Sequence, residues 1–74
     1  MRIHIEGTSQ MVEVNGVPAR VWEGTTDSGQ RVFCCVTRIA TPESEDQSKF
    51  QAELREQKPP SNAAREVFPL RMII

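Results

Sequence analysis

The chain has 74 residues, of which 38% are apolar and 26% are charged, and ten acidic against nine basic residues give a net charge of −1. This composition is typical of a globular domain and excludes a disordered chain, and the small net charge excludes bulk attraction to nucleic acid or anionic lipid. The length allows one domain over residues 1–74. No apolar run predicts a membrane span, and the alternating N-terminus lacks the apolar block of a secretory signal.

Two short strands are expected at the N-terminus. Isoleucines alternate with polar residues over 2–6 and predict a half-buried strand, which Gly7-Thr8-Ser9 ends. The segment 11–14 predicts a second strand, because it leads into Asn15-Gly16. That dipeptide is the strongest short-range signal for a type I′ hairpin turn.

Two longer strands are expected next. The segment 17–25 returns from the turn, and Pro18 places its start at an edge or facing outward, because proline has no N–H for a ladder hydrogen bond. Thr26–Gly29 suits a four-residue loop. The segment 30–40 is rich in β-branched and aromatic residues and predicts the longest strand, at the centre of the sheet.

The two hairpins together predict which side chains share a face. With a two-residue turn and a four-residue loop, Val14 pairs with Val17 and Trp22 with Phe33, and opposed residues lie on one face. The face expected to form the core is small and aliphatic: Val12, Val14, Val17, Ala19, Val21, Val32, Cys34 and Val36. The other face collects Met11, Glu13, Pro18, Arg20, Trp22, Arg31, Phe33, Cys35, Thr37 and Ile39.

After residue 40 the pattern becomes helical. Thr41-Pro42-Glu43 combines an N-cap hydroxyl, a proline and an acid, and predicts the start of a helix over 43–58. Its apolar stripe, Phe50 and Leu54, is wide enough to cover one sheet face only. Residues 67–74 alternate again and predict a last strand that pairs in the sheet.

These elements predict an α+β fold of four strands, one helix and a final strand. We expect a twisted, mostly antiparallel sheet whose aliphatic face is covered by the single helix. A small, partly open barrel closed by the last strand is the competing architecture.

No residues form a recognisable catalytic motif, so we expect no enzyme activity, no cofactor and no small-molecule substrate. Cys34 and Cys35 are adjacent and would point to opposite faces of a strand, so we interpret them as buried structural thiols, with a redox or metal role as the alternative. Unpaired thiols favour a cytoplasmic location. His4 is expected at the surface, and the acids at 43–46 match a helix N-terminus, with a weak divalent site as the alternative.

The feature that points to a function is the face that one helix would leave uncovered. Trp, Phe, Met and Arg are enriched at protein interfaces, and this face offers as binding residues Trp22, Phe33, Arg20, Arg31 and Met11. The hypothesis is a non-enzymatic protein-interaction or accessory module that binds a protein partner or a second copy of itself. Alternatively, Arg20 stacks on Trp22 and a terminal strand covers the rest.

A second functional hypothesis is a platform for single-stranded nucleic acid on the same face. Bases would stack on the rings while the arginines meet phosphates. The net charge and the expected position of Glu13 on this face weigh against it.

The stretch from Asn15 to Ala40, NGVPARVWEGTTDSGQRVFCCVTRIA, and the ending FPLRMII resemble short uncharacterised proteins encoded by bacteriophages and other mobile elements of bacteria. The resemblance includes no active-site motif. It implies a small cytoplasmic accessory protein of phage or prophage origin and assigns no catalytic or binding residue.

Overall fold

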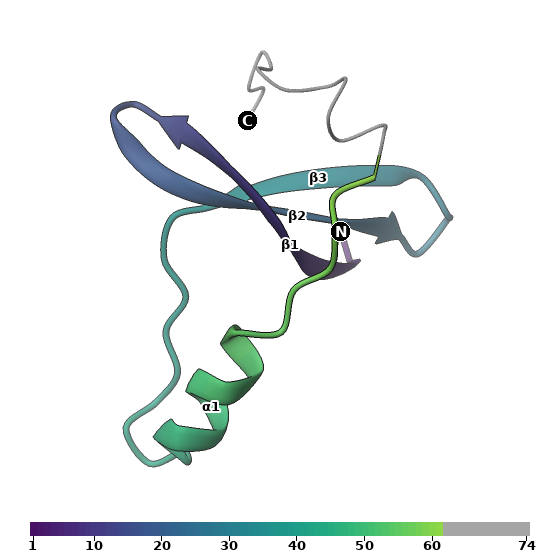
Figure 1. Cartoon of the computed structure of the whole chain (residues 1–74). Coiled ribbons are helices and arrows are strands. Elements are labelled where there is room, and N and C mark those ends of the chain that lie inside the picture. The colour runs from purple at the N-terminus through teal and green to yellow at the C-terminus, as the bar shows by residue number, and fades with distance from the viewer. Residues whose placement is uncertain (62–74) are drawn as a thin grey trace.

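A computed structural model describes residues 1–61, which form a three-stranded sheet and one short helix (Figure 1). Strand β1 is Ile3–Val14, β2 is Val17–Thr26, β3 is Arg31–Val36, and helix α1 is Gln47–Leu54. The sheet is antiparallel, in the order β1-β2-β3, and it is open. The α+β class is therefore confirmed, and residues 1–61 do not form a closed barrel. The strand predicted over 67–74 lies outside the described residues.

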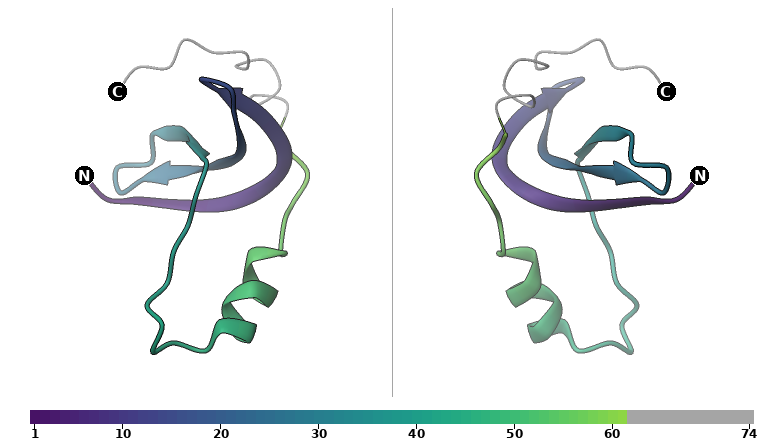
Figure 2. Two further views of the ribbon diagram at one scale, coloured as in Figure 1. Left: turned by 90° about the vertical axis from the view of Figure 1, so that its left-hand side faces the viewer. Right: turned by 90° about the vertical axis from the view of Figure 1, so that its right-hand side faces the viewer.

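A bulge joins the first two predicted strands into one. Gly7 pairs with Trp22 and Met11 with Arg20, so the three residues between them on β1, 8–10, lie opposite Val21 alone. The Thr8 hydroxyl takes the place of the missing ladder hydrogen bonds. It donates to the Val21 carbonyl at 2.6 Å and accepts from the Gln10 amide at 3.2 Å. The predicted break is wrong, because the chain bends here without leaving the sheet (Figure 2).

The first hairpin has the predicted register. Val14 pairs with Val17, and the pairing continues in step to Met11. Asn15 and Gly16 both have positive φ, 50° and 81°, as a type I′ turn requires. Because the bulge adds an even number of residues, Gly7 and Met11 lie on the same face as Trp22.

The second hairpin is one residue out of the predicted register. Its loop has three residues, 27–29, because the Thr26 amide donates to the Gln30 carbonyl at 2.9 Å. Gly29 makes this closure: at φ 91° its amide donates back to the Thr26 carbonyl at 2.9 Å. A type I turn followed by a left-handed glycine is the usual three-residue hairpin loop. Trp22 therefore pairs with Cys34, and Phe33 pairs with Glu23.

The faces of β1 and β2 are as predicted, and those of β3 are exchanged. We call the two sides of the sheet the core face, which carries Ala19, Val21 and Glu23, and the Trp22 face. Arg31, Phe33 and Cys35 pair with core-face residues, so their predicted position beside Trp22 is wrong. By the same register the Trp22 face carries Val32, Cys34 and Val36.

Strand β3 is shorter than predicted and lies at an edge of the described sheet instead of its centre. It ends at Val36, whereas a strand to residue 40 was expected. In the same register Pro18 would oppose Arg38, and proline has no N–H to donate to a longer ladder.

Helix α1 begins later and ends earlier than predicted. The Asp46 carboxylate accepts from the Lys49 amide at 3.1 Å and from the Ser48 hydroxyl at 2.7 Å, so Asp46 and not Thr41 is the N-cap. These hydrogen bonds lower the pKa of the Asp46 carboxyl. Upstream, the Glu45 amide donates to the Pro42 carbonyl at 3.0 Å and forms a separate turn.

The helix does not cover the aliphatic face, and that prediction is wrong. Figures 1 and 2 show α1 standing off the sheet, and none of its residues is buried. The segment after α1 lies along the edge of the sheet at β1 instead, where Lys58 and Thr8 form an isolated parallel β-bridge. The Lys58 amide donates to the Gly7 carbonyl at 3.1 Å, and its carbonyl accepts from Ser9 at 3.0 Å. Thr8, Ala19 and Val21 are fully buried.

At Gly24 the backbones of β1 and β2 lie too close together for a side chain. A Cβ at this position would collide with the backbone carbonyl of His4 and lie 2.7 Å from the Cα of Ile5. Because backbone atoms cannot move aside without breaking the ladder, Gly24→Ala is expected to lower the free energy of unfolding by about 3 kcal/mol. Urea titration followed by tryptophan fluorescence measures this loss.

Gly29→Ala is the control for the Gly24 variant. Its φ is also unfavourable for alanine, but no atom lies within 4 Å of the added Cβ, so the expected loss is about 1 kcal/mol. Equal losses in the two variants would contradict the close pairing at Gly24.

Candidate functional site

The Trp22 face carries a groove of about 190 Å³ beside the C-terminal end of α1. We call it the arginine groove, and its lining is mainly apolar: Met11, Pro18, Arg20, Trp22, Val36, Thr37, Arg38, Ile39 and Leu54. Three of the five predicted binding residues line it, namely Met11, Arg20 and Trp22. Phe33 and Arg31 do not.

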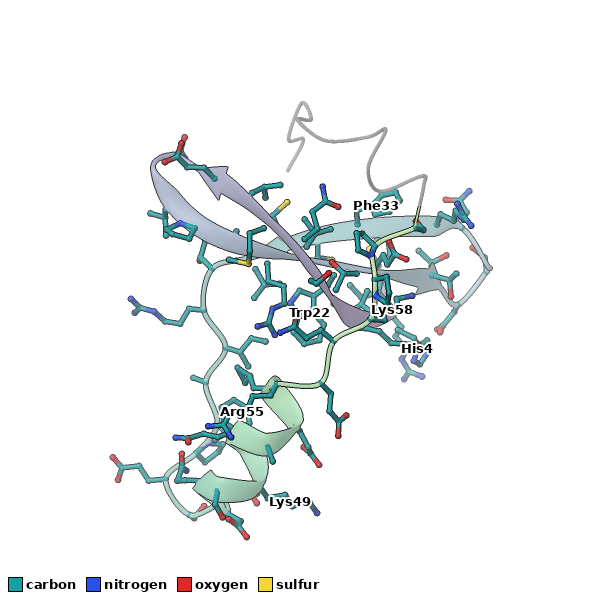
Figure 3. All side chains as sticks on the ribbon, in the orientation of Figure 1. His4, Trp22, Phe33, Lys49, Arg55 and Lys58 are labelled. Carbon is teal, nitrogen blue, oxygen red and sulfur yellow. The ribbon has the colours of Figure 1, made fainter. Side chains whose placement is uncertain are left out.

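Trp22 lies flat against β1 because Gly7 has no side chain. A Cβ at Gly7 would lie 3.3–3.4 Å from atoms of the indole ring, so the ring is in contact with the bare backbone of the opposite strand. Figure 3 shows the indole between the sheet and the end of α1. It is half-buried, so part of the ring remains at the surface of the groove.

Arg20 connects the sheet to the helix. Its guanidinium donates to the Leu54 carbonyl at 2.7 Å. Leu54 is the last residue of α1, where carbonyls lack intrahelical partners and the helix dipole favours a cation. The sequence predicts Arg20 as a partner-binding residue, whereas in the structure it caps α1 and forms one wall of the groove. A sequence pattern does not show this contact, because 34 residues separate the two groups.

Two large apolar side chains are exposed in the lining of the groove. Met11 is 57% exposed on β1 and Ile39 is 40% exposed after β3. Both line the same groove as Trp22, so the exposed apolar surface is continuous and not scattered. Contiguous patches of this kind on small proteins often mark binding sites.

A second groove lies on the other side of Trp22 and has the opposite charge. It measures about 360 Å³ and is lined by Ile5, Glu6, Gly7, Trp22, Glu53, Glu56, Gln57 and Lys58. We call it the acidic groove because Glu53 and Glu56 contribute two carboxylates to it. Glu6 lines it from β1, but it pairs with Glu23, which places its side chain on the core face. The one cation that residues 1–61 contribute to its lining, Lys58, places its ammonium 3.2 Å from the Glu23 carboxylate. Trp22 therefore separates a basic from an acidic groove.

Phe33 and Arg31 belong to the other side of the sheet. Both line a cavity of about 190 Å³ on the core face, together with Glu23, Lys58 and Ser61. Figure 3 shows Phe33 and Trp22 on opposite sides of the strands. The predicted surface that combines the two aromatic rings is therefore wrong, because the three-residue loop shifts β3 by one position.

Glu23 is a buried carboxylate that is not among the predicted site residues. One oxygen lies 3.2 Å from the Lys58 ammonium, and the other accepts from the Ser61 amide at 3.3 Å and from its hydroxyl at 3.0 Å. Burial raises the pKa of this carboxyl, but the hydrogen bonds from Lys58 and Ser61 outweigh burial and lower it overall. Glu23 thus fastens the segment 58–61 to the sheet. The sequence signal for the burial of Glu23 is its alternation with Ala19 and Val21 along β2.

Residues 1–61 also contain two cysteines and one histidine, which lie outside the linings of both grooves. No group of three or more His, Cys, Asp or Glu side chains is placed within these residues to hold a metal ion. Cys34 and Cys35 are free thiols on opposite faces, as predicted, but both are half-buried, so the prediction of buried thiols is wrong. Partial burial together with the neighbouring Cys34 raises the pKa of Cys35. His4 lies 3.2 Å from the exposed Asp27 carboxylate. In the same range, no helix is long and apolar enough to cross a membrane.

No protein-family model, curated protein or solved structure matches the chain. Function therefore has to be inferred from the two grooves and the residues between them.

The Glu23 clamp predicts an acid-sensitive contribution to stability. Because the folded-state pKa lies below the ordinary value of 4.5, the contribution is present above that pH and is lost as the pH falls through the folded-state pKa. Glu23→Gln is expected to cost about 1–2 kcal/mol at pH 7 and to flatten the loss of stability below pH 4.5. Denaturant unfolding at several pH values measures both effects, with the exposed Glu13→Gln as control. Parallel pH profiles for wild type and Glu23→Gln would contradict the clamp.

Removing the Arg20 guanidinium is expected to release α1 from the sheet. Arg20→Met keeps much of the apolar stem but leaves the Leu54 carbonyl without this donor, and the expected loss of stability is about 1–2 kcal/mol. Amide hydrogen exchange should become faster over 47–56 and stay unchanged in the β1–β2 hairpin. Unchanged exchange over 47–56 would show that this hydrogen bond does not hold the helix.

Proposed function

We propose that this chain is a non-enzymatic protein-interaction module and that the arginine groove, with Trp22 in its wall, is its binding surface. The observation that carries the proposal is the exposure of Met11 and Ile39 in the lining of a groove that also contains Trp22. Tryptophan, methionine and arginine are the residue types enriched where proteins bind one another.

The groove is held in shape before any partner arrives. Gly7 fixes the position of the indole, and the Arg20–Leu54 hydrogen bond of 2.7 Å fixes the wall that α1 provides. A surface ordered in advance loses less conformational entropy on binding. The residues of the described range 1–61 that line the groove include no carboxylate, histidine or cysteine, which also favours binding over catalysis.

The contacts of the same residues favour a protein over single-stranded nucleic acid. Phe33 lies on the core face, so among residues 1–61 Trp22 is the one aromatic residue that lines either groove of this face. The Arg20 guanidinium donates to a helix carbonyl, and the carboxylates of Glu53 and Glu56 lie on the other side of Trp22. A phosphate backbone would meet repulsion there.

Two further features support an accessory role in the bacterial cytoplasm. The cysteines are unpaired thiols, as a reducing compartment favours. The resemblance of residues 15–40 to short phage-encoded proteins agrees with a small adaptor that acts through binding.

A charge placed in the arginine groove is expected to abolish partner binding. Met11→Glu puts a carboxylate among apolar groups, and its matched control is Val17→Glu, because Val17 is 48% exposed but lies on the core face. Affinity capture from an extract of the cells that express the protein, together with light scattering, should show loss of every bound protein with Met11→Glu and none with Val17→Glu. Identical results for both variants would reject the groove as the binding surface.

A further inference from the structure

We propose that the partner accommodated by this surface is a second copy of the chain, docked about a two-fold axis that passes close to Trp22. The arginine groove of each copy then faces the acidic groove of the other. The inference rests on the proposed function, because it uses the same surface and names its occupant.

The first observation is the division of charge around one ring. Among residues 1–61, Arg20 and Arg38 line the arginine groove without any carboxylate, while Glu53 and Glu56 line the acidic groove. Lys58 does not cancel this acidic charge, because its ammonium pairs with Glu23 at 3.2 Å. Trp22 lines both grooves and so lies at the boundary between the two charges.

A two-fold axis at that boundary makes the surface complementary to itself. Rotation by half a turn exchanges the two grooves, so each basic groove meets an acidic one and both contacts are attractive. Trp22 of each copy lies near the centre of the contact, where tryptophans contribute most to binding energy. A foreign partner would need the same alternation of charge around an apolar centre, whereas a second copy has it already.

The small core gives a second, independent reason for self-association. Among residues 1–61 the buried apolar residues are Ala19 and Val21, while Met11, Ile39 and Ile3 are more than a third exposed. Small domains bury a low fraction of their surface and often gain stability by associating. A dimer through the Trp22 face would bury Met11 and Ile39 and add a shared apolar layer to this core.

A charge exchange between two variants tests the arrangement. Glu53→Lys/Glu56→Lys makes both grooves of a copy basic, and Thr37→Glu/Arg38→Glu makes both acidic, so each variant alone should dimerise at least tenfold more weakly. An equimolar mixture should recover the dimer, since opposite charges meet at both contacts. The control is Glu43→Lys/Glu45→Lys, which changes the net charge as Glu53→Lys/Glu56→Lys does but lies outside both groove linings. It should dimerise like wild type.

Sedimentation velocity at about 100 µM chain measures the association. The wild type should sediment at twice the 8.4 kDa mass of the chain, and its dimer should weaken as salt rises from about 0.05 to 0.5 M. Recovery in the mixture also shows that both variants are folded, and circular dichroism of each alone checks the same point. A monomeric wild type, or a mixture that stays monomeric while both variants are folded, overturns the proposal.

The two proposals fail in different ways. If the wild type is monomeric but captures another protein through Met11, the interaction function stands and the second copy is excluded as its partner. If Met11→Glu changes neither mass nor captured proteins, both proposals fail.

Discussion

The register of the β2–β3 hairpin determines which side chains of this protein can act together. Gly29 in the left-handed region closes a three-residue loop, and from that one conformation follows the pairing of Trp22 with Cys34 and of Glu23 with Phe33. A loop longer by one residue would place Phe33 beside Trp22 and move Cys34 to the core face. The loop thus separates two surfaces: an aromatic and charged groove surface beside α1, and a core face closed by the Glu23–Lys58 pair.

Long-range polar contacts carry much of the tertiary structure in the described part of the chain. Helix α1 is attached by the Arg20–Leu54 hydrogen bond, and the segment after it is attached by Glu23 and by pairing with the bulged part of β1. These contacts also build the site, since the same helix end forms walls of both grooves. Folding and binding therefore depend on the same few residues.

Local sequence signals predicted local structure well. Asn15-Gly16 defined the first hairpin and its register, and the aliphatic alternation assigned the core face of β1 and β2. The errors arose where a single group decided between close alternatives. Gly29 favours a three-residue over a four-residue loop, the Thr8 hydroxyl turns a break into a bulge, and Asp46 is a stronger cap than Thr41. Met11, Arg20 and Trp22 of the candidate site were predictable from the sequence. The face of the sheet beside which α1 lies was not, because contacts between residues far apart in the sequence decide it.

The pairing of Trp22 is the point on which both grooves depend, and nuclear magnetic resonance measures it directly. Cross-strand nuclear Overhauser effects between backbone protons should connect Trp22 with Cys34 and Gly24 with Val32. Effects that connect Trp22 with Phe33 would place the two rings on one face and contradict the separation of the grooves from the core face.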